Sequence, residues 1–352
     1  MRAIRQLLGF WTASLLTIGA ACAKPLTAPA NPDLCPEARE LLTYLQNIYG
    51  KQTLAAINGL KNEGLIESSC GKAPAMTGFD LSGWTSPPWA HNHNMVVQRA
   101  LNEVKTWHKR GGIVTMQCHW IHPSNPNGSA WIKAHGSKTA SEPFDFVDAL
   151  KPGTATNRQL MRDLKNHANF LEQLTEAHIP VLWRPFHEID GGWFWWTDKE
   201  HPENTAALWR IMFDYFVNER KLNNLIWVYT CAVHCGNGKE DVENLEKRRL
   251  YYPGDEYVDL VGIDIYPSEW LDIGQPQTTS YKSSFEMIHQ LAPQKMIVLG
   301  ECEAIPNPDL MDKDQAQWLY ALPWWGPGPH HSEEWIKKTY EDERLITLDR
   351  LP

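Results

Sequence analysis

The fold is constrained most strongly by a series of short apolar segments that recur along the chain, most of them separated by segments with helical periodicity. Each is a few residues long and rich in aliphatic side chains, which is typical of strands buried on both faces of a parallel sheet. Several of these segments end in His, Glu, Asp or Tyr side chains. The eight predicted strands span residues 53–57, 75–80, 113–120, 179–188, 225–230, 260–266, 296–301 and 318–325.

Helical spacing of apolar residues predicts helices at residues 36–48, 95–109, 157–177, 205–220, 283–291 and 333–340. Strands that alternate with helices indicate parallel βα units, and 352 residues suit one barrel of eight such units. We therefore predict an α/β fold, a (β/α)8 TIM barrel whose single catalytic domain spans residues 36–352. A doubly wound open sheet is the competing architecture, but Gly236 and Gly238 lack the third glycine of its phosphate-binding turn.

The N-terminus has the pattern of an export signal. Two arginines precede an apolar stretch too short to cross a bilayer, and Ala21-Cys22-Ala23 has the small residues of a cleavage site. We predict a signal peptide at residues 1–23, a proline-rich tether at 24–35, and a secreted or periplasmic monomer. Lipid attachment at Cys22 is the alternative, which Gly19 disfavours because leucine is usual there. No later stretch has the roughly 20 apolar residues of a membrane helix, so we expect no membrane insertion.

The formal net charge of −9 disfavours nucleic acid as a partner and suits an enzyme that acts on an uncharged substrate. An even number of cysteines remains after signal cleavage, so disulfides are expected in an oxidising compartment. The shortest loops would join Cys231 to Cys235 and Cys35 to Cys70. A zinc site at Cys231, His234 and Cys235 is an alternative, but no second ligand pair of similar spacing follows.

The most informative stretch is Trp183-Arg184-Pro185-Phe186-His187-Glu188, which is followed by a glycine pair and three tryptophans. Its polar side chains stand where a buried strand is normally aliphatic, and burying them is costly unless they are paired or used. Aromatic rings stack on the apolar faces of sugars, and the chain holds 17 tryptophans. We interpret the stretch as an active site; a structural ion-pair network packed with aromatic residues is the alternative.

Two carboxylates fit the chemistry of glycosidic bond cleavage. In a barrel, Glu188 at the end of the fourth strand and Glu301 at the end of the seventh lie at the same rim. Cleavage with retention uses one carboxylic acid to protonate the leaving oxygen and a second, about 5 Å away, to attack the anomeric carbon. We expect burial to keep Glu188 protonated and Arg184 to keep Glu301 ionised. Glu301 and Glu303 are two residues apart and so point the same way along a strand, which leaves the choice of nucleophile between them open. Cys302, between them, is expected to point toward the helices.

Residues 183–196 closely resemble the acid/base segment of glycoside hydrolase family 26, whose members are chiefly endo-β-1,4-mannanases. Residues 74–80, 111–115, 258–266 and 346–352 also resemble landmarks of that family. The resemblance implies an eight-stranded barrel, retention of configuration and neither a metal nor an organic cofactor. It assigns the acid/base to Glu188 and the nucleophile to Glu301. With Arg184 and Asp264 added from the strand ends, the predicted substrate-binding residues are His119, His187, Trp193, Tyr266, Trp324, Trp325, Arg184 and Asp264.

Two positions depart from the family pattern: Glu303 stands where glycine is common, and Asp190 where asparagine is common. The leading hypothesis is a secreted endo-β-1,4-mannanase whose partner is a polysaccharide, namely mannan, glucomannan or galactomannan. Alternatives with the same chemistry are a mixed-linkage β-glucanase, a β-1,3-xylanase and an exo-acting mannobiohydrolase. A non-catalytic carbohydrate-binding barrel is a further alternative, but it would need the tryptophans and not the two facing carboxylates.

Overall fold

The computed structural model describes residues 28–81, 93–125, 128–133, 143–233, 244–267, 273–329 and 331–352. The predicted signal peptide, the alternative lipid site at Cys22 and the thiol of Cys235 lie outside these ranges. Across the described ranges, no helix combines the length and apolar character that spanning a membrane requires.

Eight parallel strands close into a barrel, because each pairs with the next along the chain and β8 pairs with β1. The predicted (β/α)8 barrel is therefore confirmed. A short additional strand, β9, pairs with the start of β1. The strands are β1 (Thr53–Asn58), β2 (Met76–Asp80), β3 (Ile113–Gln117), β4 (Val181–Arg184), β5 (Leu225–Val233), β6 (Leu260–Ile265), β7 (Met296–Cys302), β8 (Tyr320–Pro323) and β9 (Leu345–Ile346).

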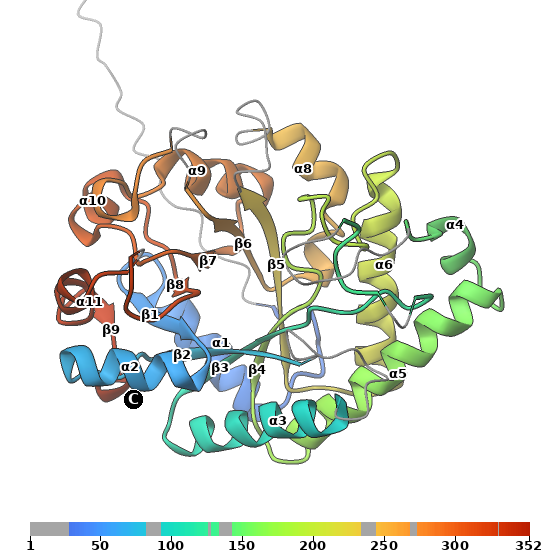
Figure 1. The fold of residues 1–352 in the computed structure, drawn as a ribbon, viewed down its shortest axis with the longest axis horizontal. Helices are drawn as coiled ribbons and strands as arrows, with labels where there is room; N and C mark the ends of the chain where they lie inside the picture. The colour runs from blue at the N-terminus through green and yellow to red at the C-terminus, as the bar shows by residue number, and fades with distance from the viewer. Residues whose placement is uncertain are drawn as a thin grey trace, which may run out of the picture.

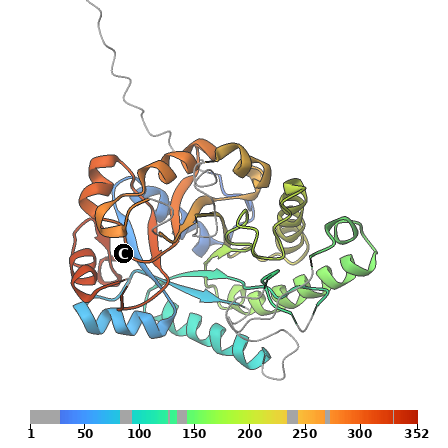
Figure 2. The same cartoon turned by 45° about the horizontal axis from the view of Figure 1, so that its top comes forward.

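Helices surround the strands (Figures 1 and 2). The described helices are α1 (Pro36–Ile48), α2 (Leu60–Cys70), α3 (His93–Lys109), α4 (Phe146–Ala149), α5 (Ala155–Thr175), α6 (Pro202–Asp214), α8 (Leu245–Tyr251), α9 (Lys282–Leu291), α10 (Pro308–Asp314) and α11 (Glu333–Tyr340). The predicted bounds of α1 and α11 are confirmed. Helix α2 was not predicted, because it buries only Glu63 and Ile66 and so lacks a clear apolar stripe.

Alternate strand residues fill the interior of the barrel, as Leu182, Val228 and Val298 do. Ala38, Leu42 and Leu45 of α1 belong to the same apolar cluster. Helix α1 precedes β1 and packs where the strands begin, so it covers the amino-terminal end of the barrel. The carboxyl ends of the strands are left for the polar residues that follow them.

The segment predicted as a tether is packed against the barrel from residue 30 onward. The amide of Ala30 donates to Asp259 Oδ1 at 2.7 Å, and Asp259 Oδ2 accepts the amide of Trp227 at 2.8 Å. Asn31 and Leu34 are buried. Because barrel residues satisfy its polar groups and cover its apolar side chain, this segment belongs to the folded domain.

Cys35 and Cys70, one of the two pairs with the shortest loops, do not form a disulfide, because both are free thiols. Cys35 lies just before α1, where its amide donates to the carbonyl of Asn223 at 2.7 Å. Cys70 ends α2, which packs against α11 in the outer layer. A short loop between two cysteines therefore did not bring them together. Cys231 is a buried free thiol.

Candidate active site

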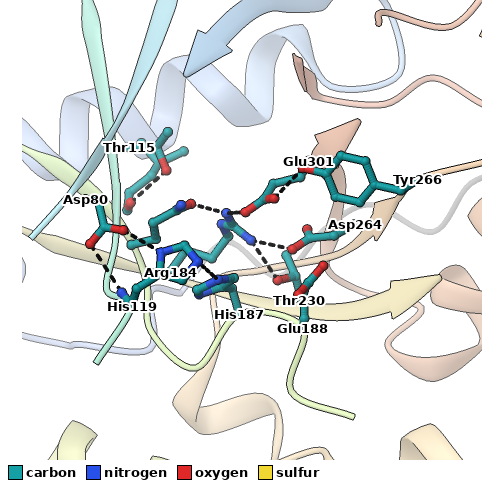
Figure 3. A network of polar contacts seen from close by, with 12 residues as sticks. Asp80, Thr115, His119, Arg184, His187, Glu188, Thr230, Asp264, Tyr266 and Glu301 are labelled. Atoms are coloured by element: carbon teal, nitrogen blue, oxygen red, sulfur yellow. Dashed lines mark hydrogen bonds and ion pairs between the residues drawn. The ribbon is translucent and has the colours of Figure 1, made fainter. Parts of the chain in front are cut away.

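Arg184, the last residue of β4, lies at the centre of a buried polar network (Figure 3). Its Nη1 donates to Asp264 Oδ2 at 2.6 Å and to Thr230 Oγ1 at 3.2 Å. Its Nη2 donates to Glu301 Oε1 and to Gln117 Oε1. Burial alone would lower the pKa of Arg184, but the carboxylates of Asp264 and Glu301 outweigh burial and raise that pKa, so the guanidinium stays charged.

Glu301 reaches this network because β7 carries a bulge. Ile263 of β6 lies opposite Leu299, whereas the next residue, Asp264, lies opposite Glu301, so Gly300 is an extra residue on β7. A Cβ atom on Gly300 would lie 2.4 Å from Asp264 Oδ1. A side chain at this position would clash with Asp264, so the geometry of the site requires glycine at position 300.

The bulge reverses the side on which Glu301 lies. Val298 packs in the barrel interior, so strict alternation would have turned Gly300 inward and Glu301 toward the helices. With the extra residue, Glu301 faces the interior and Cys302 packs in the outer core, as predicted for that thiol. Tyr266 Oη donates to Glu301 Oε2 at 2.6 Å, so both carboxylate oxygens of Glu301 accept a hydrogen bond.

Glu188 lies in a tight turn after β4, not at a strand end as predicted, because β4 already ends at Arg184. Phe186 and Glu188 have φ angles of 47° and 52°, in the left-handed region that non-glycine residues rarely adopt. The amide of Ile189 donates to the carbonyl of Thr230 at 3.1 Å and holds the turn against β5. The residue assigned as the acid thus lies in a backbone conformation that non-glycine residues rarely adopt.

The carboxyl group of Glu188 is held by the tryptophan that follows the glycine pair. Trp193 Nε1 donates to Glu188 Oε2 at 2.6 Å. A Cβ atom on Gly191 would lie 2.4 Å from the Trp193 ring, so the glycine lets the ring fold back over the turn. Burial raises the pKa of Glu188 well above its usual range, and the carboxylates of Glu301 and Asp264 raise it further.

Asp190, one of the two departures from the family pattern, fastens the same turn. Its Oδ1 accepts the amide of Ala232 at 2.9 Å, and its Oδ2 lies 3.5 Å from Nε of Arg248. Both side chains are almost fully buried. An aspartate here therefore forms a buried ion pair with α8, which an asparagine would not form.

Glu188, Asp264 and Glu301 each offer one carboxylate oxygen within 4.8 Å of the others. Among the described residues, these three acidic groups are close enough together to bind a metal cation. Arg184, however, already sets its guanidinium against two of the three carboxylates and supplies the compensating positive charge. Burial raises the pKa of the third, Glu188, and also that of Asp264, well above their usual ranges.

Two histidines line the opposite side of the network (Figure 3). His119 Nδ1 lies 2.5 Å from Asp80 Oδ2, to which it donates, and His119 Nε2 lies 3.2 Å from His187 Nε2. Of these two facing nitrogens, one donates and the other accepts. Burial, together with the neighbouring His119 and Arg184, lowers the pKa of His187 well below its usual range, so that ring is neutral near pH 7.

Both candidate tryptophans after β8 reach the network. Trp325 is 43% exposed and makes an edge-to-face contact with Tyr266, at 5.5 Å between ring centroids. Trp324 is half-buried and contacts His119 edge-to-face at 6.0 Å. The sequence left open which of the two tryptophans lies beside the predicted site, and the structure brings both there.

Three polar residues of the network were not in the predicted site: Asp80, Gln117 and Thr230. Asp80 ends β2, and Thr230 lies in the second half of β5. Gln117 ends β3 two residues before His119, and so shares its side of the strand. Polar residues at successive strand ends were therefore a usable signal. The structure brings together the predicted residues Arg184, His119, His187, Glu188, Trp193, Asp264, Tyr266, Glu301, Trp324 and Trp325.

The comparison with known families agrees with this geometry. The profile of glycosyl hydrolase family 26 matches residues 30–350. The chain belongs to glycosyl hydrolase family 26. The family match begins at the segment that packs beneath the barrel and ends two residues before the last residue of the chain.

Two curated relatives are longer than the region that this chain matches. A mannan endo-1,4-beta-mannosidase of Thermothelomyces thermophilus is 32% identical over 91% of the chain and 62% of its own length. Mannan endo-1,4-beta-mannosidase B of Piromyces sp is 29% identical over 94% of the chain and 55% of its own length. The chain thus spans somewhat more than half of each of these relatives.

A solved structure of similar sequence has the same fold over nearly its full length. The beta-mannanase from a symbiotic protist of the termite Reticulitermes speratus, complexed with gluco-manno-oligosaccharide, superposes with a TM-score of 0.80 at 30% identity. The match covers 94% of this chain and 99% of the protist chain. The Podospora anserina beta-(1,4)-mannanase gives a TM-score of 0.78 at 27% identity.

Proposed function

We propose that this chain is a secreted, retaining endo-β-1,4-mannanase with Glu188 as the acid/base and Glu301 as the nucleophile. The observation that carries the proposal is a pair of buried glutamates whose carboxylate oxygens lie within 4.8 Å of each other in unequal surroundings. Retaining glycosidases separate their two carboxyl groups by about 5–5.5 Å, and inverting enzymes by about 6.5–9.5 Å to admit a water molecule. The observed spacing favours direct attack on the sugar.

In the first step, a carboxylate oxygen of Glu301 forms a bond to the anomeric carbon while the bond from that carbon to the leaving oxygen breaks. The hydrogen bonds from Arg184 and Tyr266 orient the Glu301 carboxylate before attack. Glu188 gives its proton to the leaving oxygen, so the departing sugar leaves as a neutral alcohol. The raised pKa of Glu188 suits this role, because it keeps the proton on the acid up to a higher pH.

In the second step, Glu188 is a carboxylate and accepts a proton from water. The oxygen of that water attacks the anomeric carbon, the bond to Glu301 breaks, and both side chains return to their initial states. Arg184 also faces Asp264, so its positive charge is shared between two carboxylates.

The substrate proposal rests on similarity. The two relatives named above are mannan endo-1,4-beta-mannosidases, and the protist enzyme was solved with gluco-manno-oligosaccharide. The exposed ring of Trp325 beside Tyr266 offers a stacking surface for a sugar next to the reacting one. β-Mannan, including glucomannan and galactomannan, is therefore the substrate class we propose.

Glu188→Ala and Glu301→Ala should each lower turnover on mannan by several orders of magnitude and leave the fold intact, because each removes a group that acts in the bond-breaking step. Reducing-end release and product sizing on mannan, mixed-linkage β-glucan and β-1,3-xylan measure this. Glu303→Ala is the matched control and should keep most of the activity.

Three outcomes would overturn parts of the proposal. An inactive Glu303→Ala with a nearly normal Glu301→Ala would move the nucleophile to Glu303. Cleavage of glucan or xylan in preference to mannan would change the substrate class. Binding of mannan without cleavage would indicate a carbohydrate-binding barrel.

Export is the remaining part of the proposal and rests on the sequence of residues 1–23. The mature chain is expected to begin at Lys24, which mass spectrometry of the exported protein measures. A mature chain that begins at a lipid-modified Cys22 would contradict this and indicate membrane anchoring.

A further inference from the structure

The two tryptophans that border the network are consecutive residues whose backbone carbonyls are both bound by side chains from elsewhere. Asn62 Nδ2 donates to the carbonyl of Trp324 at 3.2 Å, and the ring of His331 bonds the carbonyl of Trp325 at 3.2 Å through Nδ1. Neither Asn62 nor His331 lies in the predicted catalytic network. The proposed reaction does not explain what Asn62 and His331 do.

Asn62 comes from the first turn of α2 and approaches the tryptophans closely. Its Nδ2 also donates to the carbonyl of Asn58, at the end of β1, at 2.8 Å. A Cβ atom on Gly326 would lie 3.0 Å from Asn62 Oδ1, so the residue after Trp325 leaves room for the amide. The side chain thus ties the carboxyl end of β1 to the segment that follows β8.

His331 holds the segment from its other end. Its side chain is fully buried, and its Nδ1 must carry a proton because a carbonyl oxygen accepts but does not donate. Backbone hydrogen bonds of 3.0 and 3.2 Å join Gly328 and His331. Burial lowers the pKa of His331 to about 4, so the ring is the neutral Nδ1–H form at neutral pH.

The segment held in this way is connected to both sides of the network. Trp325 contacts Tyr266, whose hydroxyl donates to Glu301. Trp324 contacts His119, which faces His187. The backbone that carries the two indole rings is thus held at two consecutive carbonyls.

We infer that Asn62 and His331 are positioning residues that form a two-point clamp on the carbonyls of Trp324 and Trp325 and so hold the two rings ready to bind a β-linked sugar chain. This inference rests on the proposed function for its substrate. Loss of the clamp should mainly weaken binding, because Trp325 is an exposed ring beside the reacting groups and is not one of them.

Three variants of His331 test the clamp. In His331→Asn the amide nitrogen takes the place of Nδ1 and can still donate to Trp325, whereas His331→Gln places its amide near Nε2, and His331→Leu has no donor. We expect His331→Leu and His331→Gln to raise KM on mannan roughly three- to tenfold with kcat changed less than twofold. His331→Asn should restore KM to within about twofold of the original chain.

Hydrogen exchange of the amides in residues 324–331, followed by mass spectrometry, tests the clamp without substrate. Exchange should be faster in His331→Leu and His331→Gln than in His331→Asn and the original chain. Equal exchange in all four proteins would overturn the clamp. A loss of kcat with unchanged KM would also overturn it, since that would assign His331 to the reaction step. If the original chain cleaves no β-mannan, the proposed function fails, and the exchange result alone decides on the clamp.

Discussion

Glu188 and Glu301 are both glutamates, but different neighbours donate hydrogen bonds to their carboxyl groups. Glu301 accepts hydrogen bonds on both oxygens, from Arg184 and Tyr266. Glu188 accepts one from Trp193 and is otherwise buried beside other carboxylates, which raises its pKa. Two carboxyl groups whose environments separate them in this way are suited to opposite roles in acid/base and nucleophilic chemistry.

Trp193→Phe should move the alkaline limb of the pH profile of kcat/KM to higher pH. The general acid must be protonated, so activity falls as pH rises through the pKa of Glu188. The Trp193 hydrogen bond favours the charged form of Glu188, and its loss should raise that pKa further. We also expect roughly a tenfold loss of kcat/KM at neutral pH, from one lost hydrogen bond.

The control for this experiment is Trp335→Phe, which removes an indole donor to the carbonyl of Ile305 at 2.8 Å, outside the network. Its alkaline limb should stay in place. A limb that does not move in Trp193→Phe, or that moves to lower pH, would contradict either the hydrogen bond or the assignment of Glu188 as the acid.

At the scale of the element, the bulge in β7 decides which residues face the barrel interior. Gly300 is the extra residue, and it faces Asp264 Oδ1 and Thr230 Cγ2, where a Cβ atom would lie only 2.4 and 2.7 Å away. The bulge then turns Glu301 inward beside Arg184. One glycine thus makes room for the Arg184 ion pairs and also presents the proposed nucleophile.

Gly300→Ala should lower kcat on mannan at least a hundredfold, because the new methyl group must displace Asp264 or straighten the bulge. The free energy of unfolding should also fall by about 1–3 kcal/mol, as for other overpacked sites. Steady-state kinetics and chemical denaturation measure the two effects. Gly64→Ala in α2 is the matched control: apart from its chain neighbours and the backbone of its own helix, no atom lies within 4 Å of the added methyl group, so activity should not change. Full activity in Gly300→Ala would contradict the role of the bulge.

At the scale of the whole molecule, one end of the barrel is covered and the other carries the polar network. Helix α1 and the segment from residue 30 pack at the amino-terminal end. Asp259 joins this segment to the start of β5 by accepting the amides of Ala30 and Trp227. Stability and catalysis are therefore assigned to opposite ends of the same strands, as is usual for this fold.

Asp259→Ala should lower the free energy of unfolding by about 2–4 kcal/mol, because the buried amide of Trp227 and the part-buried amide of Ala30 lose their acceptor. The kcat should stay within about twofold, since the substituted residue lies at the end remote from the network. Asp259→Asn keeps one carbonyl oxygen and should lose about half as much stability. Urea denaturation and steady-state kinetics test this prediction, and a large loss of kcat in a folded Asp259→Ala would contradict the separation of the two ends.

The sequence alone determined the order of the eight barrel strands, the positions of helices α1, α3, α5, α6, α9 and α11, the closed barrel and most of the network. These follow from local signals: apolar runs of strand length, helical spacing between them, and polar residues where the strands end. Arg184, Glu188 and Asp264 were identifiable because charged side chains in apolar runs are costly unless they are used. The family resemblance added the assignment of Glu301.

Only the tertiary structure decided which way several of these residues face and what holds them. The bulge that turns Glu301 inward arises from the pairing between β6 and β7. The alternation of side chains along β7 alone does not predict it. Cys35 and Cys70 stay apart, and the segment from residue 30 is packed, because both outcomes depend on contacts between residues distant in the chain. The carbonyl contacts of Asn62 and His331 have the same origin, since hydrogen bonds between remote segments leave no periodic pattern in the sequence.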